Sequence, residues 1–291
     1  MLKQRVVAFL PVKNGVVVQS IGFERYLPVG KPRIAVEFLN QWGIDEIILV
    51  DIDATREGRL VDLEMIRGLS RVCFVPLTVG GGIRSVADMT EVIHSGADKI
   101  CINAAAFRTP EIIEGGAETF GSQCIIVSID ARRNRRGEAE VFLNSATEPS
   151  GIHPVDFARR VERLGAGEVL LNAADRDGMK SGYDLALADE VAQAVKIPVI
   201  VCGGAGHPKH FAEGLSLPNV SAVAAGNIFH FSEHSVTVAK SYLRRRKEQE
   251  LRLDTYVDYS EFDYEPDGRI SPKSDDDLEK LFFEIHPKEV I

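Results

Sequence analysis

Pro76–Ser85 reads PLTVGGGIRS, a short β-branched run that ends in three glycines. A buried parallel strand has this composition, and glycines suit a turn whose backbone comes close to another group. Pro198–His207, PVIVCGGAGH, repeats the pattern at an offset of 122 positions, from 76 to 198. Three further pairs share that offset: 43–46 with 165–168, 51–53 with 173–175, and 102–104 with 224–226. The chain is therefore predicted to be a doubled unit.

Short apolar runs alternate with stretches whose apolar residues recur at helical spacing. The expected strands are 6–10, 47–50, 74–79, 99–102, 124–129, 168–171, 198–202 and 222–225, and the expected helices are 32–42, 60–70, 86–95, 110–120, 154–164, 183–195 and 235–250. Eight strands alternating with helices predict an α/β fold, a parallel (β/α)8 TIM barrel of roughly 250 residues. An open doubly wound sheet is the alternative, but the half-length repeat favours closure.

Composition limits the classes of partner. The net charge is −9, and residues 251–291 hold twelve acidic against five basic side chains, so the rest of the chain is close to neutral. Without a basic stripe we expect no nucleic-acid partner. No apolar run approaches the roughly 18 residues of a membrane span, and no signal peptide precedes the first strand, so a cytoplasmic protein is expected.

The four cysteines, Cys73, Cys101, Cys124 and Cys202, are widely spaced and lie in or beside strand-like runs. No ligand spacing for a metal is found, so reduced core thiols are expected, with no metal and no other cofactor.

Residues 1–250 account for the barrel, and residues 251–291 form an acidic, aromatic C-terminal extension. Its sequence includes YVDYSEFDYEP at Tyr256–Pro266 and a short helical pattern at Leu278–Glu284. Disordered segments are poor in aromatic residues. We therefore expect the extension to pack on the barrel or on a partner.

In a barrel of this type the active site lies at the C-terminal ends of the strands. The candidate ligand and phosphate residues at those ends are Asp51, Gly81, Gly82, Asn103, Asp177, Gly203, Gly204, Gly226 and Asn227. Backbone N–H groups of glycine-rich turns at helix N-termini bind phosphate. Two such sites, related by the repeat, suit a ligand phosphorylated at both ends; the alternative is that the glycines only form tight turns.

Asp130 is the candidate catalytic residue, because it follows the five uncharged residues Ile125–Ile129 at a strand end. A carboxylate there could act as a general acid or base, or it could only cap the next loop. Its counterpart in the first half, near residue 11, is Pro11. Proline has no titratable group, so a pair of catalytic carboxylates cannot form.

A second charged group is expected at the opposite, N-terminal end of the barrel. Arg5, Glu46, Lys99 and Glu168 each stand at the start of a different strand. Two cations and two anions around the lower opening predict a ring of salt bridges. From spacing alone, a purely structural role is the simpler interpretation.

These motifs resemble a known family. MLKQRVVAFLPVKNG, DIDATREG, PLTVGGGIRS, GADKICINAAA, GSQCIIVSIDA, DRDGMKSGYD and VCGGAG are similar to the cyclase subunit of imidazole glycerol phosphate synthase, HisF, along nearly all of residues 1–245. The resemblance implies a barrel that receives ammonia through its core from a HisH-like glutaminase docked on the N-terminal face. In that family the ammonia closes an imidazole ring on a doubly phosphorylated ligand.

Carried over by residue, the resemblance is uneven. Asp130 matches a catalytic aspartate, the ring of Arg5, Glu46, Lys99 and Glu168 matches the ammonia gate, and Asp98 matches a glutaminase contact. Gly82, Asn103, Asp177, Gly203 and Gly204 match ligand positions. The other catalytic aspartate falls on Pro11, a loop lysine on Gln19, and a phosphate-site serine is replaced in Gly226–Asn227. The residues that handle ammonia are thus kept, and those that cyclise are incomplete.

A complete ring together with Pro11 most resembles the WbuZ-type HisF paralogues of surface-polysaccharide gene clusters. The motif DIDATREG adds to this resemblance. In these, the barrel and a glutaminase are thought to supply ammonia to an ATP-dependent N-acetyl sugar amidotransferase. The leading hypothesis is therefore an ammonia-conducting subunit of a sugar amidation system. The alternatives are a working histidine-pathway cyclase and a non-enzymatic scaffold that senses a phosphorylated ligand.

Overall fold

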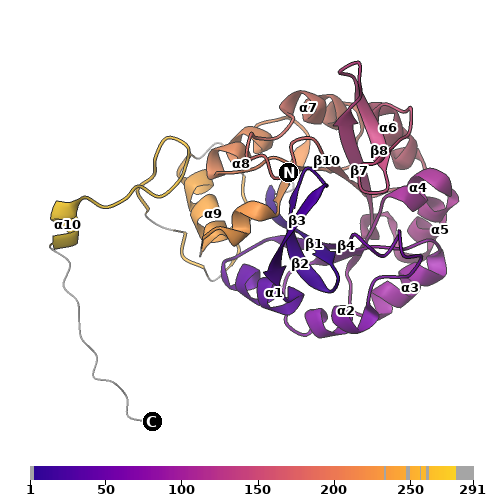
Figure 1. The fold of residues 1–291 in the computed structure, drawn as a ribbon, viewed down its shortest axis with the longest axis horizontal. Coiled ribbons are helices and arrows are strands. Elements are labelled where there is room, and N and C mark those ends of the chain that lie inside the picture. Colours follow the sequence, from indigo (N-terminus) through magenta and orange to yellow (C-terminus); the bar gives the residue numbers. More distant parts are fainter. Residues whose placement is uncertain (1–2, 233, 247–249, 256, 260–261, 280–291) are drawn as a thin grey trace, which may run out of the picture.

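Eight parallel strands close into a barrel in the computed structural model, which describes residues 3–279 except 233, 247–249, 256 and 260–261. The strands are β1 (Arg5–Lys13), β4 (Glu46–Asp51), β5 (Leu77–Gly80), β6 (Lys99–Ile102), β7 (Ile125–Arg133), β10 (Glu168–Ala173), β11 (Val199–Cys202) and β12 (Val220–Ala225). Pairing of β7 with β10 closes the ring, and helices surround it (Figure 1). The predicted (β/α)8 barrel is confirmed.

Helices connect the strands on the outside of the barrel. They are α1 (Pro32–Gln41), α2 (Leu63–Ser70), α3 (Val86–His94), α4 (Ala104–Arg108), α5 (Glu111–Phe120), α6 (Pro154–Arg163), α7 (Leu185–Ala194), α8 (Pro208–Leu215) and α9 (Ser235–Arg246), with 3-10 turns η1 (Ser122–Cys124) and η2 (Asn227–His230). Ser85 begins α3 because its hydroxyl accepts from the N–H of Asp88 at 3.1 Å. Of the helix expected at 235–250, positions 247–249 lie outside the described residues.

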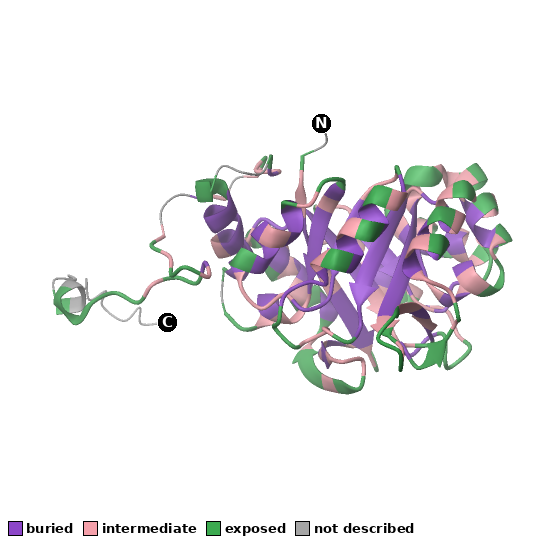
Figure 2. Cartoon of the chain, turned by 90° about the horizontal axis from the view of Figure 1, so that it is seen from above, coloured by how far each residue is buried: buried purple, intermediate pink, exposed green. Residues whose placement is uncertain are grey.

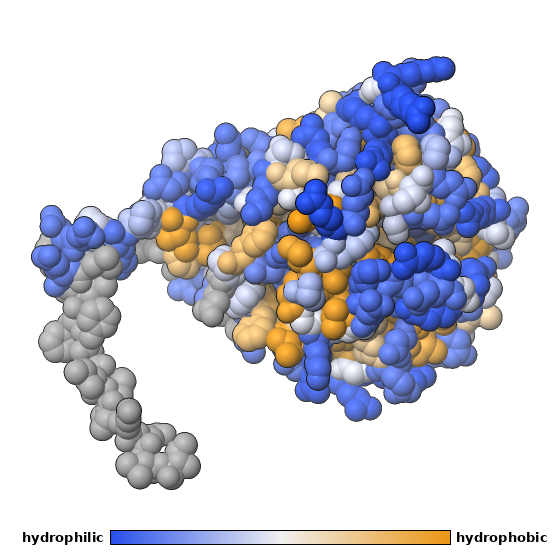
Figure 3. Space-filling model, in the orientation of Figure 1, coloured by the Kyte–Doolittle hydropathy of each residue, from blue (hydrophilic) through white to orange (hydrophobic). Residues whose placement is uncertain are grey.

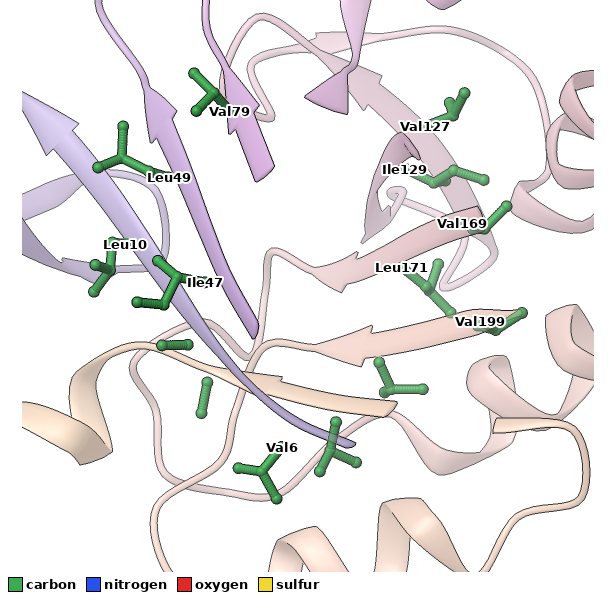
Figure 4. Close-up of a cluster of buried hydrophobic side chains, with 14 of the residues drawn as sticks. Val6, Leu10, Ile47, Leu49, Val79, Val127, Ile129, Val169, Leu171 and Val199 are labelled. Carbon is green, nitrogen blue, oxygen red and sulfur yellow. The ribbon is translucent and has the colours of Figure 1, made fainter. Parts of the chain in front are cut away.

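Alternation along each strand separates two apolar layers. In β1, Val6, Ala8 and Leu10 pack outward against the helices, whereas Val7 belongs to a smaller cluster inside the barrel. Figure 4 shows the outer layer between strands and helices, and Figure 2 shows buried residues concentrated in the strands. The side chains inside the barrel are therefore those that can line a path along its axis.

Two hairpins and two helices are absent from the sequence-based prediction. The hairpin of β2 (Val16–Ile21) and β3 (Arg25–Gly30) extends β1 through a two-residue turn at Asn14–Gly15, both with positive φ. Asn-Gly between β-branched runs is the strongest short hairpin signal, so the sequence did carry the information. A second hairpin pairs β8 (Ala139–Leu143) with β7 and β9 (Glu148–Pro149), and α4 and α8 were not expected.

The predicted strand start at Phe74 is wrong. The strand begins at Leu77, and Phe74 is 86% exposed on the loop between α2 and β5. Because this loop precedes a strand, Phe74 lies at the N-terminal face of the barrel.

The extension begins against the barrel. The backbone of Gln4 pairs with the chain on either side of Leu251, through Glu250 O at 2.7 Å and Arg252 N at 2.9 Å. Asp267 O accepts from Lys209 N at 3.0 Å, at the first turn of α8. The extension thus reaches from the N-terminal face to the start of α8. Its last described helix is α10 (Asp275–Glu279), and the rest of the helix expected at 278–284 lies outside the described residues.

None of the helices in the described part of the chain is long and apolar enough to cross a membrane.

Candidate functional site

The four charged residues at the strand starts form a closed ring of ion pairs. Arg5 contacts Glu46 at 2.7 Å and also Glu168, and Lys99 reaches both glutamates at 3.3 Å. The glutamate side chains are 5% exposed, and Arg5 and Lys99 are 15% and 19% exposed. Burial alone would lower the pKa of Arg5, but the charges of Glu168 and Glu46 raise it above its ordinary value. Arg5 therefore stays charged at the lower opening.

Inside the barrel, above the ring, the wall is apolar. Its members are Val7, Ile48, Cys101, Ile126, Leu170, Ile200, Cys202, Ala222 and Ala224. Thr78 is a polar exception that the sequence analysis missed: it is fully buried, and within the described part of the chain its hydroxyl has no hydrogen-bond partner. It lies between the outward-facing Leu77 and Val79, so it faces the barrel interior. A mainly apolar wall favours a small neutral solute over an ion.

Asp130 lies at the opposite end of this interior. Its carboxylate accepts from Asn103 Nδ2 at 3.2 Å and from Ser128 Oγ at 3.4 Å, and it is 8% exposed. Burial raises the pKa of Asp130 to about 7; the hydrogen bond from Ser128 opposes this rise and the nearby Asp177 charge adds to it. A carboxyl that titrates near neutrality can act as either acid or base. The hydrogen bond also shows that two of the predicted site residues, Asp130 and Asn103, lie in contact.

Pro11 occupies the equivalent place in the other half of the barrel. Strand pairing sets Pro11 beside Val50 and Asp130 beside Asn172, and positions 50 and 172 are related by the repeat offset. Pro11 is buried. Because it lies two residues beyond Phe9, which packs on the inner cluster, it faces the interior as well. The position equivalent to Asp130 in the other half of the barrel therefore carries no carboxyl.

The glycine-ended strands are two-fold related in space. Gly81 and Gly203 have φ of 125° and 93°, and an added Cβ would lie 2.7 Å from Asp51 O and 2.5 Å from Ala173 O. Gly82 and Gly204 leave no room for a Cβ either, because Arg59 O and Gly182 O press on them. These four positions require glycine for backbone geometry. Both predicted interpretations, tight turns and phosphate cradles, are compatible with that requirement.

Asp51 is engaged by its own loop. Its carboxylate pairs with Arg59 Nη1 at 2.6 Å and accepts from the N–H groups of Asp53 and Ala54 at 3.1 and 3.2 Å. Gly82 N donates to Thr55 Oγ1 at 3.3 Å. Asp51 thus orders the 53–60 loop over the first glycine turn.

Asn227 and Asp177 hold the β2–β3 hairpin over the mouth, where Figure 1 shows it crossing the middle of the ring. Asn227 Nδ2 donates to Ser20 O at 2.7 Å, and Asn227 Oδ1 accepts from Ser20 N at 3.2 Å. Gly22 N donates to Asp177 O at 2.9 Å. The side-chain amide of Asn227 therefore pairs with the hairpin as a neighbouring strand would. At the preceding residue, Gly226, a Cβ atom would lie only 2.7 Å from Phe9 O, so the backbones approach closely there.

Asp177 and Asn172 leave polar atoms unused beneath that hairpin. Burial raises the pKa of Asp177 to about 6. Asp177 Oδ2 and the Oδ1 atom of Asn172, which is 1% exposed, have no hydrogen-bond partner among the described residues. Buried polar atoms without partners mark places where a bound molecule can supply them. Together with Asp130 they make the mouth the candidate ligand site.

The raised pKa of Asp130 predicts a pH-dependent stability difference. A carboxyl whose pKa is about 7 in the folded chain and 3.8 ordinarily binds its proton more tightly when folded. Its stabilising effect is therefore complete below the ordinary pKa and is lost as pH rises to about 7. Relative to Asp130→Asn, wild type should lose up to about 4 kcal/mol of unfolding free energy between about pH 4 and about pH 8.

Urea unfolding of both proteins across that range measures the difference. Asp156→Asn, which removes a carboxylate that is 70% exposed, is the matched control. Its difference in unfolding free energy from wild type should not change with pH. If the difference between wild type and Asp130→Asn were also independent of pH, the raised pKa of Asp130 would be contradicted.

The sequence of this chain is similar to those of known histidine biosynthesis proteins. Residues 5–235 match the family model described as histidine biosynthesis protein. Imidazole glycerol phosphate synthase subunit HisF of Clostridium botulinum (strain Langeland) is 42% identical over 246 residues, covering 84% of this chain and 97% of that protein. The subunit of the same name from Bacillus cereus (strain G9842) is 45% identical over 244 residues, with the same coverage. The chain therefore belongs to the HisF family of histidine biosynthesis proteins.

Proposed function

We propose that this chain is the synthase-type subunit of a glutamine-dependent amidotransferase. It takes ammonia from a HisH-like glutaminase at the N-terminal face and delivers it at the mouth for the amidation of an N-acetyl sugar. The observation that supports this proposal is the contrast between the two ends: the ring of Arg5, Glu46, Lys99 and Glu168 is complete, whereas Pro11 stands where a partner for Asp130 is needed.

The ring and the wall above it suit ammonia. Each cation of the ring bridges both glutamates, so displacing one of them opens the centre without leaving either anion unpaired. Beyond the ring, a charged ammonium ion would lose its hydration in an apolar interior, whereas neutral ammonia loses far less. We therefore assign the ring the role of gate, with opening coupled to a docked glutaminase at Asp98 and its surroundings.

The mouth suits delivery better than cyclisation. General acid–base groups contribute about 10²–10⁴-fold each, and one of the two equivalent positions holds proline. An ATP-dependent sugar amidotransferase is proposed as the second partner, which would activate the acceptor itself and need only ammonia from this chain.

A second candidate function is the cyclase reaction of imidazole glycerol phosphate synthase. The relatives that are 42–45% identical carry that name, and this favours cyclisation more directly than sugar amidation. Asp130, with its pKa near neutrality and its contact to Asn103, would then serve as the remaining acid–base group.

Two assays on one preparation separate these functions. The cognate glutaminase is measured with and without this chain, and turnover of the histidine-pathway ligand is measured beside it. Glutaminase activation without turnover supports delivery, and the sugar amidotransferase is then added to look for glutamine-dependent amidation. Turnover at a rate typical of enzymes establishes the cyclase and removes the delivery proposal; ligand binding without activation or turnover would indicate a sensing scaffold instead.

Phe74 is expected to be a main anchor of the glutaminase interface. It is 86% exposed at the face that carries the ring, and Asp98 lies nearby, accepting from Leu77 N at 2.8 Å. A large aromatic side chain buried at the centre of an interface is worth at least about 2 kcal/mol, so Phe74→Asp should weaken glutaminase binding by at least about thirtyfold.

Phe38→Asp is the matched control, because Phe38 is a 48% exposed aromatic residue on the outer helix α1. Titration calorimetry with the glutaminase measures both. Equal affinities for the Phe74 and Phe38 variants would remove Phe74 from the interface.

A further inference from the structure

The glycine turns at the mouth differ in how the helix after each of them begins. We call residues 81–84, which precede α3, the first glycine turn, and residues 203–206, which precede α8, the second glycine turn. The start of α3 is capped by Ser85, whose hydroxyl accepts from Asp88 N at 3.1 Å. The equivalent residue of α8, 122 positions later, is His207, and within the described chain its side chain makes no cap bond. The first N–H groups of α8 therefore need an acceptor from elsewhere.

The C-terminal extension supplies that acceptor. Asp267 O accepts from Lys209 N at 3.0 Å, in the first turn of α8. The next residue, Gly268, has φ of 86°, and a Cβ there would lie 2.9 Å from both Pro208 Cβ and Tyr242 Cδ2. Beyond this contact the extension leads away: α10 stands apart from the barrel in Figure 1, and Figure 3 shows hydrophilic surface at that place. The part of the extension around Asp267 is therefore closely fitted to the start of α8.

His210 links the start of α8 to the second glycine turn. It is buried, and its Nδ1 accepts from Gly206 N at 3.1 Å. Its ring also lies 3.2 Å from where a Cβ of Gly182 would be, and Gly182 N donates to Gly204 O at 2.9 Å. His210 therefore holds the second glycine turn both directly and through Gly182.

The equivalent bond in the first glycine turn uses a carboxylate. Arg84 N donates to Asp88 Oδ2 at 2.8 Å, and positions 84 and 88 precede 206 and 210 by the repeat offset of 122. A histidine Nδ1 can accept only while it carries no proton. Burial, and then the charge of His207, lowers the pKa of His210, so the ring is kept in the neutral form. The second glycine turn thus depends on surroundings that the first does not need.

We propose that the C-terminal extension positions the second glycine turn, acting through the start of α8 and through His210. The first glycine turn needs no such support, because Ser85 caps α3 from within the same half of the barrel. One of the two candidate phosphate cradles is then set by a segment outside the barrel. By linkage, whatever the second glycine turn binds also strengthens the docking of the extension. This inference concerns how the mouth is held and does not depend on ammonia delivery.

Gly268→Val tests the proposal in the full chain. The added side chain meets Pro208 and Tyr242 and should displace the extension from α8. Exchange of the Gly206 amide hydrogen should then rise by about fivefold, the factor expected when one hydrogen bond is lost, whereas exchange of the equivalent Arg84 amide should not change. Gly137→Val is the matched control: its φ is 79° and no described atom lies within 4 Å of an added Cβ, so it brings similar backbone strain without a clash.

Two variants of His210 test the link itself. His210→Leu removes the acceptor, so exchange of the Gly206 amide should rise by about fivefold. His210→Asn keeps an acceptor close to the position of Nδ1 and should restore most of the protection. If only the volume of the ring mattered, leucine would protect Gly206 at least as well as asparagine.

Nuclear magnetic resonance of the exchanging amides separates the outcomes. Gly206 exchange that stays slow in Gly268→Val while Lys209 exchange rises would overturn the proposal, because the extension would then dock on α8 without positioning the turn. Equal acceleration at Gly206 and Arg84 would overturn it as well, since the effect would then be global. These readouts use neither glutaminase nor ligand, so a failure here is distinct from a failure of the proposed function.

Discussion

Replacing Lys240 by methionine is expected to lower the free energy of unfolding by about 3–5 kcal/mol. Lys240 is fully buried, and its ammonium group contacts Asp45 Oδ1 at 2.6 Å, Gly43 O at 2.7 Å and Arg252 O at 3.0 Å. Methionine fills similar space but leaves the carboxylate of Asp45 without its counter-charge. Since Arg252 belongs to the extension, the same change should also loosen the extension from the barrel.

Burial explains why the loss is large. It lowers the pKa of Lys240 and raises the pKa of Asp45, so each charge depends on the other for its stability inside the protein. In Lys240→Met, Asp45 can escape the penalty by binding a proton. The destabilisation should therefore be greater at about pH 8 than at about pH 5.

Two comparisons separate this effect from lost packing. The double variant Lys240→Met, Asp45→Asn should recover much of the stability, because it removes the unpaired charge. Lys209→Met breaks an exposed pair with Glu213 and should change stability by less than about 1 kcal/mol. Urea unfolding measures all of them, and equal losses for the single and double variants would show that the buried charge is not the cause.

The barrel could be predicted because its information is repeated. The strands read as short apolar runs, and the glycines at 81, 82, 203 and 204 are required by backbone approach in both halves. The ring residues could also be placed, because residues at the starts of parallel strands converge on one end of a barrel.

Features that depend on three-dimensional neighbours could not be predicted in this way. Lys240 reads as an ordinary polar position of the final helix, and only the fold shows that Asp45 and the extension enclose it. Phe74 looked like strand because it belongs to a short apolar run, although the chain pairs only from Leu77. The β2–β3 hairpin at the mouth differs from these features, because Asn14–Gly15 is a local turn signal that predicts it from the sequence alone.

The largest effect on activity is expected from Pro11→Asp. Pro11 and Asp130 occupy equivalent positions in the two halves, so the substitution places a second carboxyl at the mouth. If the missing acid–base group is what prevents cyclisation, turnover of the histidine-pathway ligand should rise by about 10²–10⁴-fold. Ammonia-dependent turnover, measured without glutaminase, reports the change at the mouth alone.

Pro11→Asn is the decisive control, because it removes the proline ring and restores the backbone N–H without adding a titratable group. Turnover that rises only in Pro11→Asp assigns the deficit to the carboxyl, whereas equal turnover in both variants assigns it to the backbone. Glutaminase activation should be the same in all three proteins, since the ring lies at the other end of the barrel. A wild-type chain that already cyclises at the rate of Pro11→Asp would show that Asp130 suffices, and the mouth would then be a complete active site.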